Sequence, residues 1–429
     1  MSTALLTDHY ELTMLQAALS SDNAGRRSVF ELFARRLPGG RRYGVVAGTG
    51  RILDALEEFR FGAAELDFLR GHEVVDEQTL EWLADFRFSG DIWGYAEGEV
   101  YFPHSPVLVV ESTFAEAVLL ETLVLSILNH DSAIASAASR MTWAAGDRPC
   151  IEMGSRRTSE WAAVAAARAA YVAGFSATSN LEASRRHGVP STGTSAHSFT
   201  LLHDTEEQAF RAQVSSLGEG TTLLVDTYDI AEAVRLGVEI AGPDLGAVRI
   251  DSGDLGVLAR QVRAQLDELG ATKTRIVVTS DLDEYAIAAL GSAPVDGYGV
   301  GTQLVTGSGH PTCGFVYKLV AHEGADGELV DVAKKSKDKA SMGGRKYALR
   351  RLDDHGVADA EVIGVGQPPE GDGNDRHLLV QLVEDGEVVG REPLDVVRVR
   401  HERSREELPI TARTLQKGDP VIPTLHVGG

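Results

Sequence analysis

Four short polar segments could carry chemistry, because each follows a run whose composition predicts a strand. They are residues 152–157 (EMGSRR), 193–198 (GTSAHS), 249–255 (RIDSGDL) and 297–303 (GYGVGTQ). In parallel α/β folds, ligands bind at the carboxyl ends of strands and in the loops that follow. We therefore take these segments as the candidate binding and catalytic positions.

The segment 249–255 places two carboxylates and a hydroxyl directly after a strand. Asp251 and Asp254, three residues apart, could hold sugar hydroxyls or a hydrated Mg²⁺. Ser252 or Asp254 could instead cap the following helix. Arg249 and Asp251 together at the end of a buried strand favour a functional interpretation.

Glycines alternate through residues 297–303 and end in a Gly-Thr pair. Because glycine has no side chain, the backbone N–H groups of Gly301 and Thr302 could approach a phosphate closely. The last strands of α/β barrels often carry such a site. The same glycines could also serve only to form a tight turn.

Two further segments carry an imidazole and a pair of guanidinium groups. His197 lies between hydroxyl residues, where it could be a general base, a phosphoryl acceptor or a structural residue. Arg156 and Arg157 form a fork for anionic oxygens, or a solvated helix start. In a chain with a net charge of −22, a local cluster of basic side chains is more notable than it would be in a basic chain.

The elements that position these segments alternate between short apolar strands and helices. Strands are expected at 149–153, 221–225, 247–250, 274–279 and 296–300, and helices at 115–140, 159–173, 230–236, 254–269 and 283–290. This rhythm is typical of a parallel α/β sheet or barrel.

The two ends of the chain have a mixed α+β texture. Helices are expected at 4–19, 50–58 and 63–70, strands at 28–33 and within 91–110, and hairpins at 315–321 with 328–332 and at 377–383 with 387–389. Residues 421–429 show no clear element. We expect an α+β domain at 1–114, an α/β barrel at 115–312, and a β-rich segment at 313–429 that packs with the first domain.

Composition excludes several classes of protein. Of 429 residues, 43% are hydrophobic and 24% charged, which is typical of a globular chain, and the formal charge of −22 disfavours a general nucleic-acid binder. Two cysteines exclude a disulfide framework and a cysteine zinc site. With no signal-peptide pattern and no stretch apolar enough to span a bilayer, we expect a soluble cytoplasmic protein.

Motifs of other enzyme classes are missing from the sequence. It contains no G-x-S-x-G, no Walker loop and no H-E-x-x-H, which argues against a P-loop nucleotidase or a zinc protease. The basic run from Lys334 to Lys346 is either a solvated loop or a segment that closes over phosphates, and its role stays open.

Taken together in order, these pieces resemble nicotinate phosphoribosyltransferases across nearly the whole chain. The matching segments are 7–14 (TDHYELTM), 152–157, 193–198, 225–229 (VDTYD), 249–254 and 299–302 (GVGT). The resemblance implies an irregular α/β barrel with an α+β domain built from the N- and C-terminal segments. It also implies a homodimer whose active sites draw on both subunits.

The reaction implied by the resemblance belongs to the salvage of pyridine nucleotides for NAD. Nicotinate and phosphoribosyl pyrophosphate give nicotinate mononucleotide and pyrophosphate, with Mg²⁺ on the diphosphate and ATP hydrolysis coupled through a phosphohistidine. The enzyme is therefore classed as a ligase, although its chemistry is that of a glycosyltransferase. The resemblance assigns no metal ligand from the protein.

The family pattern also implies residue roles. Nicotinate lies near Thr194, Arg249 and the neighbouring subunit's counterpart of Tyr10, while Arg156 faces the ring and its carboxylate. His197 is the phosphorylated histidine and Asp251 lies near the ribose. The residues implied for the 5′-phosphate are Ser280, Asp281, Gly301 and Thr302.

Two positions bear on the choice of substrate. Met153 stands where the family often has a phenylalanine that stacks on the pyridine, although a thioether can also contact a ring. Ser179 aligns with an aspartate of nicotinamide-using relatives, and its lack of charge favours nicotinate.

Several alternatives remain at this point. They are a nicotinamide or quinolinate phosphoribosyltransferase, and a phosphosugar-binding barrel without catalysis. An aldolase or lyase would require a lysine at a strand end, and none of the strand ends named above carries one.

Overall fold

The computed structural model describes residues 2–333 and 342–428, which form two compact units. One unit comprises Met1–Ser136 with His310–Gly429, and the other comprises Ala137–Gly309. The boundary between them falls within helix α6 (Glu121–Ala145). Of the basic run, Lys334 to Lys339 lie outside the described residues.

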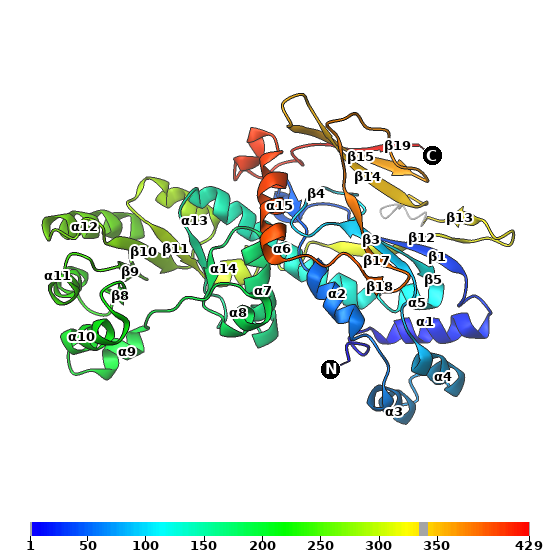
Figure 1. Ribbon diagram of the computed structural model, residues 1–429, viewed down its shortest axis with the longest axis horizontal. Helices are drawn as coiled ribbons and strands as arrows, with labels where there is room; N and C mark the ends of the chain where they lie inside the picture. Colours follow the sequence, from blue (N-terminus) through cyan, green and yellow to red (C-terminus); the bar gives the residue numbers. More distant parts are fainter. Residues whose placement is uncertain (1, 334–341, 429) are drawn as a thin grey trace. The chain divides into compact units, whose positions relative to one another are not determined.

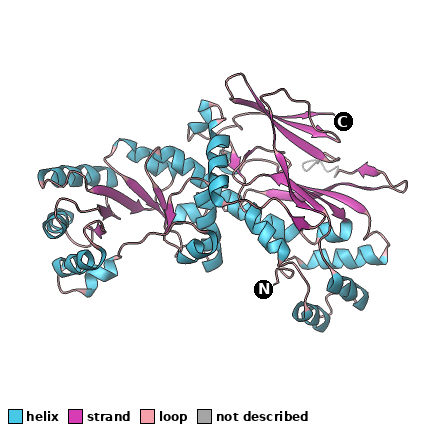
Figure 2. Ribbon diagram, viewed as in Figure 1, coloured by secondary structure: helices cyan, strands magenta, loops and turns pink. Residues whose placement is uncertain are grey.

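The unit formed by Ala137–Gly309 is built on an open parallel sheet, with helices around it (Figures 1 and 2). Its strand order is β7-β6-β11-β10-β9-β8. The strands are β6 (Cys150–Glu152), β7 (Ala177–Thr178), β8 (Thr222–Leu224), β9 (Ala247–Ile250), β10 (Arg275–Ser280) and β11 (Gly297–Val300). Every pairing in this sheet is parallel, so the carboxyl ends of the strands share one edge.

Helices connect these strands as α7 (Glu160–Val172), α8 (Leu181–His187), α9 (His197–Leu202), α10 (Glu206–Leu217), α11 (Ile230–Ala241), α12 (Leu255–Glu268), α13 (Glu284–Ala289) and α14 (Thr302–Val305). Three aspartates cap helices shortly after strand ends, namely Asp229, Asp254 and Asp283. The capping role considered for Asp254 is confirmed, because its carboxylate accepts the Val257 N–H.

The other unit interleaves the two ends of the chain in one sheet, of order β13-β12-β1-β5-β3-β17-β18. Here β1 (Arg27–Ala34), β3 (Asp91–Tyr95) and β5 (Leu108–Thr113) lie beside β12 (Phe315–Glu323), β13 (Leu329–Asp331), β17 (Leu379–Glu384) and β18 (Glu387–Val388). The expected α+β domain made from N- and C-terminal segments is thus confirmed.

Smaller elements complete this unit. They are the pair β2 (Gly44–Val45) and β4 (Val100–Tyr101), the sheet of β16 (Arg376–His377), β14 (Lys346–Leu352), β15 (Ala358–Val365) and β19 (Thr424–Val427), and helices α1 (His9–Ser20), α2 (Thr49–Glu57), α3 (Ala63–Gly71), α4 (Glu77–Asp85), α5 (Phe114–Val118) and α15 (Leu394–Glu406). Short 3₁₀ turns occur in this unit at Pro38–Gly40 and Ile410–Arg413, and in the unit formed by Ala137–Gly309 at Leu290–Ser292.

Three of the expected elements differ from the structure. The helix expected at 115–140 is two helices, α5 and α6, and the helix expected at 4–19 begins only at His9, after Asp8 at its N-cap. The tail, expected to have no element, contributes β19, which pairs in parallel with β15. Such a pairing depends on a distant strand and leaves little local signal.

Candidate active site

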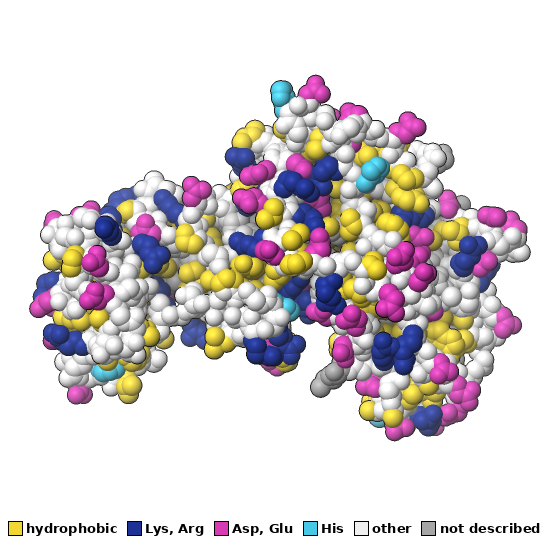
Figure 3. Space-filling model, viewed as in Figure 1, with side chains coloured by type: hydrophobic (Ala, Val, Ile, Leu, Met, Phe, Trp, Pro, Cys, Tyr) yellow, Lys and Arg dark blue, Asp and Glu magenta, His cyan; other side chains and the backbone are white. Residues whose placement is uncertain are grey.

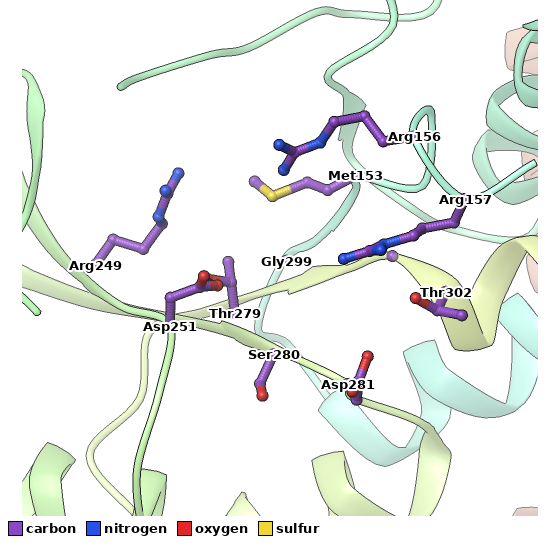
Figure 4. A pocket seen from close by; sticks show the side chains of 11 residues that line it. Met153, Arg156, Arg157, Arg249, Asp251, Thr279, Ser280, Asp281, Gly299 and Thr302 are labelled. Atoms are coloured by element: carbon purple, nitrogen blue, oxygen red, sulfur yellow. The ribbon is translucent and has the colours of Figure 1, made fainter. Parts of the chain in front are cut away.

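A pocket of about 270 Å³ opens at the carboxyl edge of the parallel sheet (Figure 4). The residues that line it are Met153, Arg156, Arg157, Arg249, Asp251, Thr279, Ser280, Asp281, Gly299, Gly301 and Thr302. They come from the ends of β6, β9, β10 and β11 and the turns that follow. The structure thus brings together most of the residues singled out in the sequence.

Three arginines point into this pocket (Figure 4). The Arg249 guanidinium is fixed by the loop before α9, since it donates to Thr194 Oγ1 at 3.1 Å and to the Ser195 carbonyl at 3.0 Å. Burial lowers the pKa of Arg249, against the opposing effect of neighbouring carboxylates. In the part of the chain that the structure describes, neither Arg156 nor Arg157 has a hydrogen bond or ion pair through its guanidinium. The pocket therefore offers cations to an anionic ligand.

Asp251 is held at the end of β9 by contacts from two neighbouring strands. The Thr279 hydroxyl, at the end of β10, donates to Asp251 Oδ1. The backbone N–H of Asp251 donates to Asp226 Oδ2 at 2.9 Å, and the Ser252 hydroxyl donates to the same oxygen at 2.7 Å. Asp226 follows β8, so residues at three adjacent strand ends hold Asp251, with Asp226 on its backbone and Thr279 on its carboxylate.

His197 is the first residue of α9 and lies beside these carboxylates. Its Nδ1 is 3.1 Å from Thr227 Oγ1, and its Nε2 is 3.8 Å from Asp226 Oδ1 and 3.9 Å from Asp251 Oδ2. The Asp226 side chain is only 2% exposed and its Oδ1 has no hydrogen-bond partner among the described residues. The imidazole thus faces two carboxylates across a space wider than a hydrogen bond.

The Gly301–Thr302 segment begins the short helix α14 on one side of the pocket. Ser280 ends β10 and Asp281 follows it on the other side, and β10 pairs with β11 in the sheet. Backbone N–H groups, hydroxyls and one carboxylate therefore lie around this part of the pocket, where Figure 4 shows Ser280, Asp281 and Thr302.

Met153 lies over Gly299 and forms part of the pocket wall. A Cβ atom added to Gly299 would come within 2.7 Å of Met153 Sδ and would also collide with the Thr279 methyl group. The absence of a side chain at Gly299 thus makes room both for the thioether and for the threonine that holds Asp251.

Glu152 is a buried carboxylate behind this wall that the sequence analysis gave no role. Its Oε1 accepts the Gly154 N–H and its Oε2 accepts the Thr178 hydroxyl. Burial raises the pKa of Glu152, and these hydrogen bonds oppose that rise. The carboxylate fixes the turn that carries Met153 and Arg156. In the sequence, the position of Glu152 directly before this turn was the one feature that could have indicated its structural role.

Some predicted site residues do not line the pocket. Thr194 reaches it only through Arg249. Ser179 is exposed after β7, and its N–H donates to the Glu152 carbonyl at 2.8 Å. Tyr10 lies on α1 in the other unit and is 44% exposed, and burial together with Glu121 raises its pKa to about 12.

Two residues that the sequence analysis did not assign to the site contact its candidate catalytic groups. Thr279 was treated only as the end of a strand, and Asp226 was quoted within 225–229 without a role. Their hydroxyl and carboxylate positions at strand ends were visible in the sequence. Their contacts depend on which strands are neighbours in the sheet, and the sequence did not show the strand order.

No helix in residues 2–333 and 342–428 is long and apolar enough to cross a membrane. On the face drawn in Figure 3, Lys and Arg side chains are interspersed with Asp and Glu. The cationic pocket is thus a local feature of an acidic chain. An open parallel sheet with arginines, carboxylates and a glycine-rich segment at its carboxyl edge is typical of α/β proteins whose ligand site lies at that edge.

Comparisons with known proteins identify the family. Residues 5–129 match the nicotinate phosphoribosyltransferase (NAPRTase) N-terminal domain. The chain is 58% identical over 429 residues to nicotinate phosphoribosyltransferase pncB1 of Mycobacterium tuberculosis, covering 98% of this chain and 94% of that protein. It is 38% identical over 360 residues to nicotinate phosphoribosyltransferase of Bacillus subtilis, covering 81% and 73% of the two chains.

A solved structure has the same fold. Human nicotinic acid phosphoribosyltransferase matches with a TM-score of 0.81 at 24% identity, over 98% of this chain and 97% of that one. The chain belongs to the nicotinate phosphoribosyltransferase family and is an enzyme of this type. The family expected from the sequence is confirmed, and so is the α/β fold class, in which the expected barrel is the open half-barrel sheet of β6 to β11.

Proposed function

We propose that the pocket at the carboxyl edge of the sheet joins nicotinate to phosphoribosyl pyrophosphate. The pyridine nitrogen forms a bond to ribose C1 as the bond from C1 to the pyrophosphate oxygen breaks, which gives nicotinate mononucleotide and pyrophosphate. The product would feed the salvage of pyridine nucleotides for NAD. The observation that carries the proposal is the set of three arginines with Asp251 and the Gly301–Thr302 segment in one pocket.

Each group of residues has a physical task in this reaction. Arg156, Arg249 and Met153 bind and orient the nicotinate ring and its carboxylate, and Thr194 acts through its hydrogen bond to Arg249. Ser179, outside the pocket lining, would favour nicotinate only through its lack of charge. Asp251 lies near the ribose, where its charge stabilises the cationic character that develops at C1. Ser280, Asp281, Gly301 and Thr302 surround the 5′-phosphate. Holding both anions in line removes much of the entropic barrier to the transfer.

Mg²⁺ bound to the diphosphate would stabilise the leaving pyrophosphate. Among the described residues, no group of three or more His, Cys, Asp or Glu side chains is arranged to hold a metal. Asp251, Asp281 and Ser280 provide single oxygen donors around the pocket. This donor set fits an ion held mainly by the substrate, with few protein ligands.

ATP would be coupled to the transfer through His197. An imidazole nitrogen attacks the γ-phosphorus of ATP and ADP leaves, and water later cleaves the P–N bond to release phosphate. The contacts of His197 with Thr227, Asp226 and Asp251 support this role, because they orient the ring beside the ribose-binding carboxylate.

A homodimer would complete the site. Tyr10 lies outside the unit that forms the pocket and is exposed. In the proposed dimer, the partner subunit's Tyr10 covers the nicotinate ring.

The test is to measure product formation from nicotinate or nicotinamide with phosphoribosyl pyrophosphate and Mg²⁺, with and without ATP. Nicotinate turnover that ATP raises, with nicotinamide inert, is expected. His197→Ala should abolish the effect of ATP and the labelling of the protein by γ-³²P-ATP.

Other outcomes would point elsewhere. A preference for nicotinamide or quinolinate would contradict the assignment of the ring site. Binding of phosphoribosyl pyrophosphate without turnover would indicate a barrel that only binds phosphosugars. Full ATP-dependent stimulation in His197→Ala would refute the phosphohistidine.

A further inference from the structure

Arg157 is a pocket residue to which the proposed function gives no task. Its backbone N–H donates to the Gly154 carbonyl at 2.8 Å, which closes a tight turn after β6. Its guanidinium points into the pocket beside Gly299 and Thr302 (Figure 4). The guanidinium itself has no hydrogen bond or ion pair to any described residue, so its positive charge is available to a ligand.

The turn that carries Arg157 packs directly against the Gly301–Thr302 segment. A Cβ atom on Gly154 would lie 3.2 Å from the Gly301 carbonyl oxygen and would collide with Val305 of α14. A Cβ atom on Gly301 would lie 3.4 Å from the Met153 carbonyl oxygen. These close backbone approaches fix the base of the Arg157 side chain relative to the segment proposed for the 5′-phosphate.

The charges around that segment also require a cation there. Asp281 approaches it from β10, so a phosphate dianion bound at Gly301 would lie near a carboxylate. Backbone N–H groups carry only partial charges, and a nearby full positive charge offsets the repulsion better. Arg249 lies in β9, two strands away from β11, and its guanidinium is tied to Thr194 and Ser195.

We propose that Arg157 binds the 5′-phosphate of phosphoribosyl pyrophosphate, while Arg156 faces nicotinate. The two adjacent arginines would then divide the two substrates between them. Arg157 would make the site selective for a 5′-phosphorylated sugar over an unphosphorylated one. This inference rests on the proposed function and assigns one further binding residue to it.

The experiment distinguishes binding of the 5′-phosphate from binding of the pyrophosphate group by using one simple probe for each. The affinities of ribose 5-phosphate and of inorganic pyrophosphate are measured by calorimetry for the wild type, Arg157→Gln and Arg157→Lys. Arg211→Gln is the control, because Arg211 is exposed on α10 and, among the described residues, its guanidinium pairs with Glu207 alone. Circular dichroism and the thermal midpoint verify that each variant is folded.

Arg157→Gln should lower the affinity for ribose 5-phosphate by roughly 10- to 100-fold, as expected for a lost charge-assisted contact. It should lower the affinity for pyrophosphate by less than about threefold. Arg157→Lys keeps the charge without the planar fork and should retain part of the affinity. In steady state, the KM for phosphoribosyl pyrophosphate should rise while the KM for nicotinate stays near that of the wild type.

Three results would overturn the assignment. They are an unchanged affinity for ribose 5-phosphate, a loss confined to pyrophosphate, and an equal loss for both probes. Failure of the proposed function itself looks different, because the wild type would then bind ribose 5-phosphate through Arg157 yet form no nicotinate mononucleotide.

Discussion

Replacing Thr279 with valine removes a single hydroxyl while keeping a β-branched side chain of nearly the same shape. In the structure this hydroxyl donates to Asp251 Oδ1, and the Thr279 side chain is almost completely buried at the end of β10. The methyl group that lies against Gly299 remains in the variant. The substitution therefore tests one contact of the proposed ribose-binding carboxylate.

The magnitude follows from the kind of hydrogen bond. A hydrogen bond to a charged group contributes about 1.5–3 kcal/mol, which corresponds to a change of about 10- to 150-fold in kcat/KM. The Asp251 side chain is 42% exposed, so water can replace the lost donor and the effect should lie near the lower end. We expect kcat/KM for phosphoribosyl pyrophosphate to fall by about tenfold.

Steady-state kinetics of Thr279→Val, with Thr279→Ser as the matched control, gives the measurement. Serine keeps the hydroxyl and loses only the methyl group, so it should retain most of the activity. Urea denaturation should show a change in unfolding free energy of about 1 kcal/mol or less for the valine variant. Two results would refute the reasoning: a valine variant within twofold of the wild type, or a serine variant as impaired as the valine variant.

Three further predictions concern packing, pH and charge burial. Gly299→Ala should displace Met153 and raise the KM for nicotinate by about tenfold in steady-state assays, because the added Cβ would come within 2.7 Å of Sδ. Burial raises the pKa of Glu11 from 4.5 to about 7, so ionising it in the folded state costs stability as pH rises through that range. Relative to Glu11→Gln, the wild type should therefore lose about 2 kcal/mol of unfolding free energy between pH 5 and pH 8, measured by urea denaturation at both pH values. Arg350→Leu should lower the unfolding free energy by about 3–5 kcal/mol in urea, because it leaves Glu361 charged, fully buried and without its 2.7 Å ion pair.

The sequence predicted the parallel sheet better than the rest of the fold, for a physical reason. The strand expected at 247–250 is β9, Ala247–Ile250, because a short buried apolar run bounded by polar residues has few other structures available. β19 is largely exposed and exists through its pairing with β15. Helix α4 was missed in the same part of the chain where α2 and α3 were expected.

The site shows the same division between local and long-range information. Arg249 and Asp251 could be found because they lie at the end of a predicted strand, and the glycine pattern pointed to Gly301. The contact between Thr279 and Asp251 depends on β10 lying beside β9 in a particular register, with Val278 opposite Ile250. His197 was expected in a loop, whereas it begins helix α9 beside Asp226 and Asp251.

The strand order explains why one pocket can hold the parts of a long substrate in sequence. Along the carboxyl edge, the turn after β6 comes first, then the Gly301 segment of β11, then the end of β10, and then Asp251 of β9. A phosphosugar lying along this edge with its 5′-phosphate at β11 places its ribose toward β9, beside His197. Gly299 of β11 lies between these ends, and a Cβ atom there would collide with both Met153 and Thr279. The glycine therefore lets the turn after β6 and the end of β10 both pack against β11, which keeps Thr279 in place to donate to Asp251.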